Sequence, residues 1–516
     1  MAKGRKKIDT NNVSAGDAMV NRVVRFNNKN GRAVVGSYDA AATTNDNRRH
    51  WLAADNLSAD AALNPMIRRV IVSRARYEVA NNGYGGGIVN TLANHTVGTG
   101  PRLQLTGGDR KANQRIEQRF MKWSRATGLA QTLKLLRIAK AVAGEGFAVI
   151  ASNPGINDEH KLSLVLYETD QVAADTFTLD TFIDTYGNGQ VKELDGVQFD
   201  QYGNPSLYKI HRVHPGETGA LAADNSKTIM EVKARYVIHY ANIQRPGQHR
   251  GISEFAPVLE TLANLRRYMR AVLLAAETGA NISFLMYTES PASDTGEAAK
   301  INANEIYEFE ANAGVSLPAG WKASQLKAEQ PTLNHIEYVH GKVNEIARPF
   351  HMPLNIALAN SSGYNYASGR MDHQTYFKGV RIEQNYMEVT AVDPAFNEWV
   401  IEDKILYPED YKDPFTGHQY FWDGTEHVDP LKEANAQDTR LKNGSTNHAI
   451  EFGKEGRDWE IEIAQTYTEK MRLLEYDIDF VKQRQQLLKE AGITLEEFLA
   501  ATSKNPPANN LTIIEE

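Results

Sequence analysis

PFHMPLNIALANSSGYNYASGRMDHQTYFKGVRIEQNYMEVTAVDPAFNEWVIED, residues 349–403, is the stretch around which this chain is organised. It opens with a short segment punctuated by prolines and passes through Asn360–Ser368, which consists almost entirely of Asn, Ser, Gly and Tyr. From there to Val392 no proline interrupts the chain, and Gly379 is the last glycine of the stretch. Asn, Ser and Gly favour loops, and a long run without breakers favours a helix. The sequence therefore predicts a polar loop that leads into one long helix.

The predicted helix has apolar residues on two sides. The first stripe consists of Tyr376, Val380, Met387 and Ala391. The second consists of Met371, Thr375, Ile382, Tyr386 and Val389. Because a helix that is apolar on more than one side packs against more than one neighbour, we expect this helix to lie between several packed elements.

The composition is that of an ordinary globular protein. The 516 residues include 41% hydrophobic and 23% charged residues, enough for a sizeable core divided among several domains. The chain has no cysteine, which excludes disulfides, thiolate metal sites and cysteine catalysis. No apolar run approaches the about 18 residues of a membrane helix, and the basic N-terminus lacks the apolar region of a secretory signal. We expect a soluble protein made inside the cell, without a membrane partner.

The net charge of -7 argues against a protein that grips nucleic acid over its whole surface. It does not exclude a protein that surrounds DNA loosely. Each Lys or Arg that neutralises a phosphate adds salt-sensitive affinity, and a protein through which DNA must move gains nothing from that affinity.

Residues 1–64 are polar and begin with a cluster of Lys and Arg. They are predicted to form a loosely draped arm, with a basic arm that touches nucleic acid as the alternative. Helical spacing then begins near Asn64 and is expected to end at the glycines GYGGG (83–87), after which IVNTLANHTV (88–97) predicts a second helix. The glycines lack the preceding strand of a dinucleotide fingerprint, so cofactor binding is not expected.

A mixed α+β domain is predicted up to about residue 245. Two further helices are expected at 109–128 and 129–146, and alternating apolar residues predict strands from residue 147 onward. The turn Tyr202–Pro205 predicts a hairpin within 196–213, and VKARYVIHYANI (232–243) is expected to continue the same sheet.

The strongest helical pattern lies between Phe255 and Ala276, after the breaker cluster PGQHRGISEF (246–255). Arg266, Arg267 and Arg270 gather on and beside its polar face. A solvated face is the usual meaning of such a cluster, and contact with a partner subunit or with DNA phosphate is the alternative.

The segment 281–330 is predicted to form a small module between two long helices. Strand, polar helix and hairpin patterns follow one another within 281–330, and a helix with one apolar stripe, from Ile336 to Ala347, follows Pro331. This organisation predicts an arm with a tip. After a loop-rich region, helices are expected at 429–444, 445–456, 458–477 and 494–503.

Signatures of catalysis are missing. Nothing matches a phosphate-binding GxxxxGK[ST] loop, GxSxG or HExxH. His211 and His214 have helix-like spacing but end a predicted strand, and the group around His418, Asp423 and Asp429 fits no ligand spacing. We therefore predict no catalytic residue, no cofactor and no metal.

Several motifs in this order resemble the portal proteins of tailed double-stranded DNA bacteriophages, of the lambda-like family. The most specific are PGQHRG (246–251) and NYASGR (365–370), and the similarity extends over roughly residues 65–475. The remaining motifs are residues 73–100, 143–150, 196–210, 236–262, 311–326, 346–370, 429–434 and 455–465. The chain departs from the family at Asn355, where bulkier or acidic residues are common, and the C-terminal region is only patchily similar.

The resemblance implies an α+β portal-protein fold with a mixed α/β wing, a helical stem, a small α/β clip, a long tunnel helix and a helical crown. The implied segments are a polar arm (1–64), the wing (65–253), a stem helix (254–280), the clip (281–330), a second stem helix (331–348), the tunnel loop with the long helix and the return to the wing (349–428), and the crown with the C-terminal tail (429–516).

The resemblance also implies a non-enzymatic ring, most often of twelve copies, at one vertex of the capsid. Double-stranded DNA is packaged and ejected through its channel, and the ring contacts terminase, the major capsid protein and head–tail adaptor proteins. The protein is expected in the virion after assembly in the host cytoplasm. The implied DNA-facing candidates are Asn360, Ser361, Ser362, Gly363, Tyr364, Asn365, Tyr366 and Ser368.

Two other classes of protein are kept as alternatives. A head–tail adaptor or scaffold-associated ring is generally much shorter and lacks a helix–module–helix stem. A nuclease would use the scattered His and Asp residues, and cleavage of plasmid with Mg²⁺ or Mn²⁺ would reveal it.

Overall fold

The computed structural model describes residues 26–27, 33–34, 49–173, 192–218, 229–281, 285–288, 321–324, 334–424, 430–454 and 456–490. The chain divides into two compact units, Met1–Ala62 and Leu63–Glu516. Helices and strands both contribute, and every strand pairing in the described part is antiparallel. The expected mixture of helix and sheet is confirmed.

The first unit contains little described structure. β1 (Phe26–Asn27) pairs with β2 (Ala33–Val34), and α1 (Ala59–Ala62) ends the unit. The prediction of a draped arm concerns residues that lie mostly outside the described part, so it stays a prediction.

The second unit begins with two helices that share one capping residue. α2 (Pro65–Asn81) ends and α3 (Gly83–Val97) begins at Asn82, whose side chain accepts a hydrogen bond from the Tyr84 backbone at 3.1 Å. Such a side-chain acceptor satisfies a free N–H of the first helical turn. The chain therefore turns sharply without a loop.

The expected boundary between two helices near the glycines is confirmed, but its expected position is wrong, because α2 already ends at Asn81 and the glycines of 83–87 lie inside the first turns of α3. A Cβ on Gly85 would stand 3.3 Å from Leu262, and one on Gly86 would stand 3.0 Å from the Val79 carbonyl. The glycines thus allow neighbouring helices to approach closely.

The largest core surrounds a small three-stranded sheet. α4 (Arg110–Thr127) and α5 (Leu129–Ala143) precede it, and the strand order is β10 (Val237–Ala241), β4 (Glu145–Ser152), β5 (Leu162–Tyr167). The fully buried aromatic side chains of this core include Phe120, Trp123, Phe396 and Trp399. Residues that are far apart in the sequence therefore share one core.

A second sheet of four strands has its own small core. Its order is β6 (Lys192–Leu194), β7 (Val197–Phe199), β8 (Pro205–His211), β9 (Ile229–Lys233). The predicted hairpin is β7–β8 and is confirmed. The expectation that 232–243 continues one sheet is wrong, because β9 pairs with β8 whereas β10 pairs with β4.

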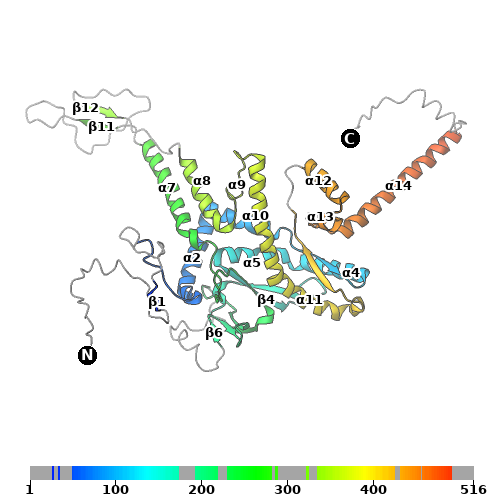
Figure 1. The fold of residues 1–516 in the computed structure, drawn as a ribbon, viewed down its shortest axis with the longest axis horizontal. Coiled ribbons are helices and arrows are strands. Elements are labelled where there is room, and N and C mark those ends of the chain that lie inside the picture. Colours follow the sequence, from blue (N-terminus) through cyan, green and yellow to red (C-terminus); the bar gives the residue numbers. More distant parts are fainter. Residues whose placement is uncertain are drawn as a thin grey trace, which may run out of the picture. The chain divides into compact units, whose positions relative to one another are not determined.

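The arm predicted between two helices is described in part. α7 (Leu259–Asn281) and α8 (His335–Ala347) pack along each other, as Figure 1 shows. β11 (Leu285–Thr288) pairs with β12 (Trp321–Ser324). The polar helix expected within 281–330 lies outside the described residues. The lower part of the predicted α7 stripe is buried, including Leu262 and Leu265, whereas Leu273 is exposed.

The long helix that follows the polar loop is longer than predicted. A short helix, α9 (Leu354–Ala357), precedes the loop, and α10 (Tyr366–Met387) follows it. A π-helical segment (Glu388–Val392) then joins α10 to α11 (Asp393–Leu406) without interruption (Figure 1). One continuous helical element therefore runs from the loop into the core around Trp399.

The C-terminal region contributes one strand that pairs with an early strand of the second unit, and helices follow this strand. β13 (Gly417–Phe421) pairs with β3 (Arg102–Thr106), a strand pairing that the sequence analysis did not anticipate at β13. α12 (Pro430–Lys442), α13 (His448–Lys454) and α14 (Trp459–Glu490) follow. The helix expected at 494–503 lies outside the described residues. Among the helices that the structure describes, none has the length and apolar character needed to cross a membrane.

Candidate functional site

The polar loop between α9 and α10 is exposed and internally hydrogen-bonded. Ser361, Ser362, Gly363, Tyr364 and Asn365 are all exposed. The Asn360 side chain accepts hydrogen bonds from the backbone N–H of Ser362 at 2.9 Å and from its hydroxyl at 2.7 Å. Gly363 has a φ of 88°, a conformation that costs glycine little, and a Cβ there would meet open space. The loop therefore has a defined turn and presents its side chains to solvent.

Two of the predicted loop residues belong to the helix instead. Asn365 is the N-cap of α10, and its side chain accepts a hydrogen bond from the Ser368 backbone at 2.9 Å. Tyr366 and Ser368 therefore lie in the first turn of α10, which corrects the predicted loop boundary. The signal was present in the sequence, since Asn followed by a run without breakers is a common helix start.

The loop carries no fixed charge. No Asp, Glu, Lys or Arg occurs between Arg348 and Arg370. The exposed part of the loop is therefore a patch of hydroxyl, amide and phenol groups, which can make and break hydrogen bonds with water or a partner without an ionic attraction.

One stripe of α10 is buried as predicted. Tyr376, Val380 and Met387 are at most 5% exposed and pack in two core clusters. Of the other stripe, Met371, Ile382 and Val389 are 70%, 65% and 62% exposed, whereas Tyr386 is partly buried and stacks on Tyr240. The expectation that this helix packs against more than one neighbour is confirmed, because α10 contacts α3 and contributes to two separate core clusters.

Buried polar contacts fix α10 against α5 and β10. The Glu383 carboxylate accepts a hydrogen bond from Lys140 at 2.6 Å and another from the Tyr240 hydroxyl. Burial alone would raise the pKa of Glu383, but Arg137 and Lys140 outweigh it and lower that pKa. Because a charged group in this position needs its partners, α10 cannot slide without breaking them.

Of the three arginines predicted as contact candidates, Arg267 and Arg270 are accessible to a partner, whereas Arg266 is engaged within the chain. Arg266 instead holds Glu78 at 2.7 Å, and its guanidinium lies 5.2 Å from the centre of the Tyr77 ring. Arg267 and Arg270 are exposed on α7. Arg266 therefore joins α7 to α2, and only the other two keep the role of surface cations.

PGQHRG (246–251), one of the two most specific sequence motifs, contacts the motif of residues 143–150 in the interior of the second unit. Glu145 is fully buried and accepts hydrogen bonds from Arg250 at 2.9 Å and from the Gly251 backbone at 2.7 Å. Arg68 and Asp195 complete a cluster of two cations and two anions. Burial would raise the pKa of Glu145, but Arg250 and the other donors hold it well below its usual range. This cluster is structural.

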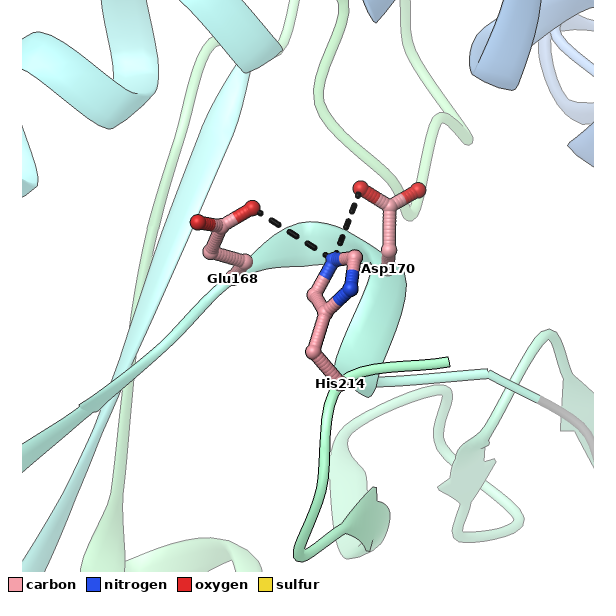
Figure 2. Close-up of side chains that lie close together, drawn as sticks. All are labelled: Glu168, Asp170 and His214. Atoms are coloured by element: carbon pink, nitrogen blue, oxygen red, sulfur yellow. Dashed lines mark ion pairs between the residues drawn. The ribbon is translucent and has the colours of Figure 1, made fainter. Parts of the chain in front are cut away.

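A group of possible metal ligands that the sequence did not reveal lies near the surface of the second unit. Glu168, Asp170 and His214 point toward one another (Figure 2), with ligand atoms within 4.8 Å of one another. Arg76, however, lies 2.7 Å from both carboxylates. A guanidinium already neutralises the pair, so the arrangement does not fit a metal ion well, and we assign none to it.

The other suspected group is dispersed by the fold. His418 contacts Asp393 at 2.9 Å, whereas the Asp423 carboxylate accepts hydrogen bonds from the backbone and hydroxyl of Thr99, both at 2.6 Å. Each serves a separate structural contact. Residues 425–429, which include His427 and Asp429, lie outside the described part of the chain.

Comparison with known proteins defines the family. The family described as phage portal protein, lambda family, matches residues 45–384, well over half of the chain. The chain belongs to this lambda family of phage portal proteins, which are structural proteins rather than enzymes.

Individual relatives are distant. A probable portal protein of Halomonas phage phiHAP-1 is 22% identical over 409 residues, which cover 75% of this chain and 77% of that protein. A chain in the virion of a native gene transfer agent particle is 14% identical, with 74% of this chain and 93% of that chain covered and a TM-score of 0.45. A chain in the neck of that particle, computed with C12 symmetry, is 15% identical over 73% of this chain and 90% of its own length, with a TM-score of 0.43.

Proposed function

We propose that this chain is the subunit of a portal ring at one capsid vertex, through whose channel double-stranded DNA enters and leaves the head. Membership of the portal family supports the role as a whole. The observation that carries the channel assignment is the uncharged, exposed loop at the start of α10. The ring is expected to contain twelve subunits, in the virion of a phage.

The chemistry of the loop suits a surface past which DNA slides. Each cation that touches a phosphate releases counterions and adds affinity that must be lost again when the DNA advances. Hydroxyl and amide groups offer only weak, exchangeable hydrogen bonds, and Tyr364 adds weak stacking at most. A loop without fixed charge therefore touches DNA while adding little drag.

The exposed stripe of α10 supports assembly into a ring. Met371, Ile382 and Val389 lie on one line along the helix, since residues at these spacings share a face. Such a stripe on a helix whose opposite face is packed into the core is typical of a surface that a partner covers. We assign this stripe to contact between neighbouring subunits.

The remaining segments take the roles that the family implies. The wing at 65–253 faces the major capsid protein, the stem helices at 254–280 and 331–348 line the lower channel, and the clip at 281–330 docks terminase and later the head–tail adaptor proteins. The segment 349–428 supplies the tunnel loop, and 429–516 forms the crown. Arg267 and Arg270 are surface cations for DNA or for a neighbouring subunit.

The test is a shortened loop. Deletion of residues 361–364 keeps the Asn365 cap, so α10 and ring assembly should stay intact, whereas DNA packaging or retention should fall. Ring formation is checked by electron microscopy and packaging by protection of DNA from nuclease. A matched variant, Ser361→Lys with Ser362→Lys, adds phosphate contacts and should make DNA binding by the ring more salt-dependent. Unchanged packaging in both variants would refute the loop assignment, and monomers under all conditions in the unmodified protein would refute the ring.

A further inference from the structure

Asn355 of α9 is a buried polar residue at the base of the loop between α9 and α10. It is only 3% exposed. Polar groups that are buried to this extent are found with hydrogen-bond partners. The partners of Asn355 lie on both sides of the loop, so this residue decides how the two ends of the loop are held.

The backbone carbonyl of Asn355 holds the beginning of the loop. It accepts a hydrogen bond from the Asn360 N–H at 3.0 Å, and the Ile356 carbonyl accepts one from the Ala359 N–H at 3.1 Å. Together with Ala359 at a φ of 50°, these two bonds form a Schellman motif, which ends a helix. Alanine rarely adopts this left-handed conformation, and a strained residue persists only where its surroundings hold it. The beginning of the loop therefore depends on the anchor at Asn355.

The side chain of Asn355 holds the other end of the loop. Its amide nitrogen Nδ2 lies 3.2 Å from Nε2 of His373, which lies about two turns into α10. One residue thus contacts the chain before the loop and the chain after it. Residues 356–372 are closed into a single segment by this contact.

This hydrogen bond requires a neutral His373 ring. The side-chain oxygen Oδ1 of Asn355 already accepts a hydrogen bond from the Ile356 N–H at 3.0 Å, so the NH₂ group is the part that faces His373. An amide NH₂ group only donates, and a neutral imidazole has one nitrogen that accepts. Because a protonated imidazole has no acceptor, the contact exists only while the ring is neutral.

The titratable neighbours of this contact come from α3 and from α10. α9 carries no titratable side chain. On α3, His95 contacts the same Phe377 ring as His373 does, and burial, together with His373, lowers the pKa of His95. On α10 itself, Arg370 and Asp372 contribute one charge of each sign within one turn of His373. His95 is therefore the residue that must be tested beside His373.

We propose that Asn355 is a positioning residue which, together with neutral His373, clasps the two ends of the loop. The clasp, defined as Asn355 with His373, keeps the loop short, because without it residues 356–372 can all move with the loop. It thereby fixes how far the uncharged side chains reach toward DNA. This consequence rests on the proposed function, whereas the clasp itself is a property of the subunit.

The experiment measures loop mobility with a single spin label. Because the chain has no cysteine, Ser361→Cys provides one labelling site on the exposed loop. Labelled full-length rings are measured between pH 8 and pH 5, the range in which histidine changes its charge. The label should be restrained at pH 8. The ratio of mobile to restrained label should rise at pH 5 by about 5- to 100-fold, the effect of leaving one buried polar group unpaired.

Two variants separate the clasp from a general loosening of the structure. Asn355→Ala removes the amide and should give a mobile label at every pH. His373→Gln keeps an acceptor at nearly the same place but does not titrate, so the label should stay restrained at every pH. His448→Gln changes an exposed histidine of α13 and should leave the pH response as it is. If Asn355→Ala does not assemble, the pH response and its loss in His373→Gln still decide.

DNA packaging by the same rings, without the label, tests the consequence of the clasp. Protection of DNA from nuclease should be lower with Asn355→Ala rings than with His373→Gln rings at pH 8. Equal protection, despite a mobile loop, would overturn the link between loop position and DNA.

The remaining outcomes are distinct. A restrained label in Asn355→Ala, or a pH response that persists in His373→Gln, overturns the clasp and leaves the proposed ring and channel intact. A response that His95→Gln abolishes and His373→Gln does not overturns it in favour of His95. Monomers under all conditions overturn the proposed function, whereas the label in the monomer still reports whether the clasp exists.

Discussion

Removal of Arg250 provides the most direct test of how the buried ion cluster around Glu145 stabilises the protein. The side chain is 4% exposed and donates hydrogen bonds to Glu145 at 2.9 Å, to the Val172 carbonyl at 2.9 Å and to the Thr169 carbonyl at 3.2 Å. Arg250→Met keeps most of the volume but leaves the buried cluster with one excess negative charge. Breaking a buried ion pair by removing one partner costs about 3–5 kcal/mol. Since a protein of this kind is stable by about 5–15 kcal/mol, the loss is a large part of the total.

A double-mutant cycle isolates the electrostatic part. Glu145→Gln alone leaves the cluster with one excess positive charge and should cost a similar amount. The double variant restores neutrality, because Arg68 and Asp195 still balance each other. We therefore expect the double variant to be more stable than the sum of the single losses by about 2–3 kcal/mol.

The assay is urea unfolding followed by tryptophan fluorescence, at one oligomeric state fixed by particle mass. Arg125→Met, which removes an exposed arginine of α4, is the control and should change stability by less than about 0.5 kcal/mol. Arg250→Lys should remain destabilised, because a single ammonium group cannot reach the acceptors that the guanidinium fork spans. If the losses in free energy of unfolding of the two single variants simply add up in the double variant, the proposed energetics of the cluster would be refuted. An unchanged free energy of unfolding in Arg250→Met would refute them as well.

Three further predictions concern other sites of the second unit. Burial, reinforced by Asp458, raises the pKa of Glu117 from 4.5 to about 7. Its contribution to stability is therefore complete below about pH 4.5 and is lost as the pH rises to about 7. Glu117→Gln should remove about 1–2 kcal/mol of this dependence in melting curves, and an unchanged pH profile would contradict this expectation. Gly251→Ala should unfold the wing or lower its melting temperature markedly, because a Cβ would collide with the Gly144 carbonyl; a melting temperature equal to that of the natural chain would show that the backbone can move apart. Leu262→Asp places an unpaired carboxylate where the side chain is fully buried, so soluble rings should not form, and rings like those of the natural chain would disprove the assigned helix face.

The helices could be predicted well because their periodicity is a local property of the sequence. α4, α5, α7 and α8 occur where apolar residues repeat at helical spacing. The incorrect predictions concern positions whose conformation depends on contacts with residues that are far away in the sequence. The glycines at 83–87 were expected to break a helix, but close contact with Leu262 makes them useful inside α3.

In the candidate site, too, local features could be predicted from the sequence and long-range contacts could not. The loop and its lack of charge are visible in the sequence, whereas the pairing of β13 with β3 and the meeting of Glu145 with Arg250 depend on residues about a hundred or more positions apart. No local pattern contains that information. Likewise, the exposure of Met371, Ile382 and Val389 on α10 becomes evident only when the covered face of the helix is known.

The shared core has a consequence for the synthesis of the subunit. Phe120 and Trp123 need Phe396 and Trp399 to complete their surroundings, and contacts of such long sequence separation form late because the intervening chain must first be closed into a loop. In a nascent chain, Glu145 lacks its partner Arg250 until the chain has been synthesised as far as that residue. The core is completed only when α11 has been synthesised as well. The core that Phe120 and Trp123 share with Phe396 and Trp399 therefore cannot be completed by the N-terminal half of the chain alone. A chain truncated before α11 therefore lacks part of the core that its earlier residues need, and it exposes apolar surface that favours aggregation.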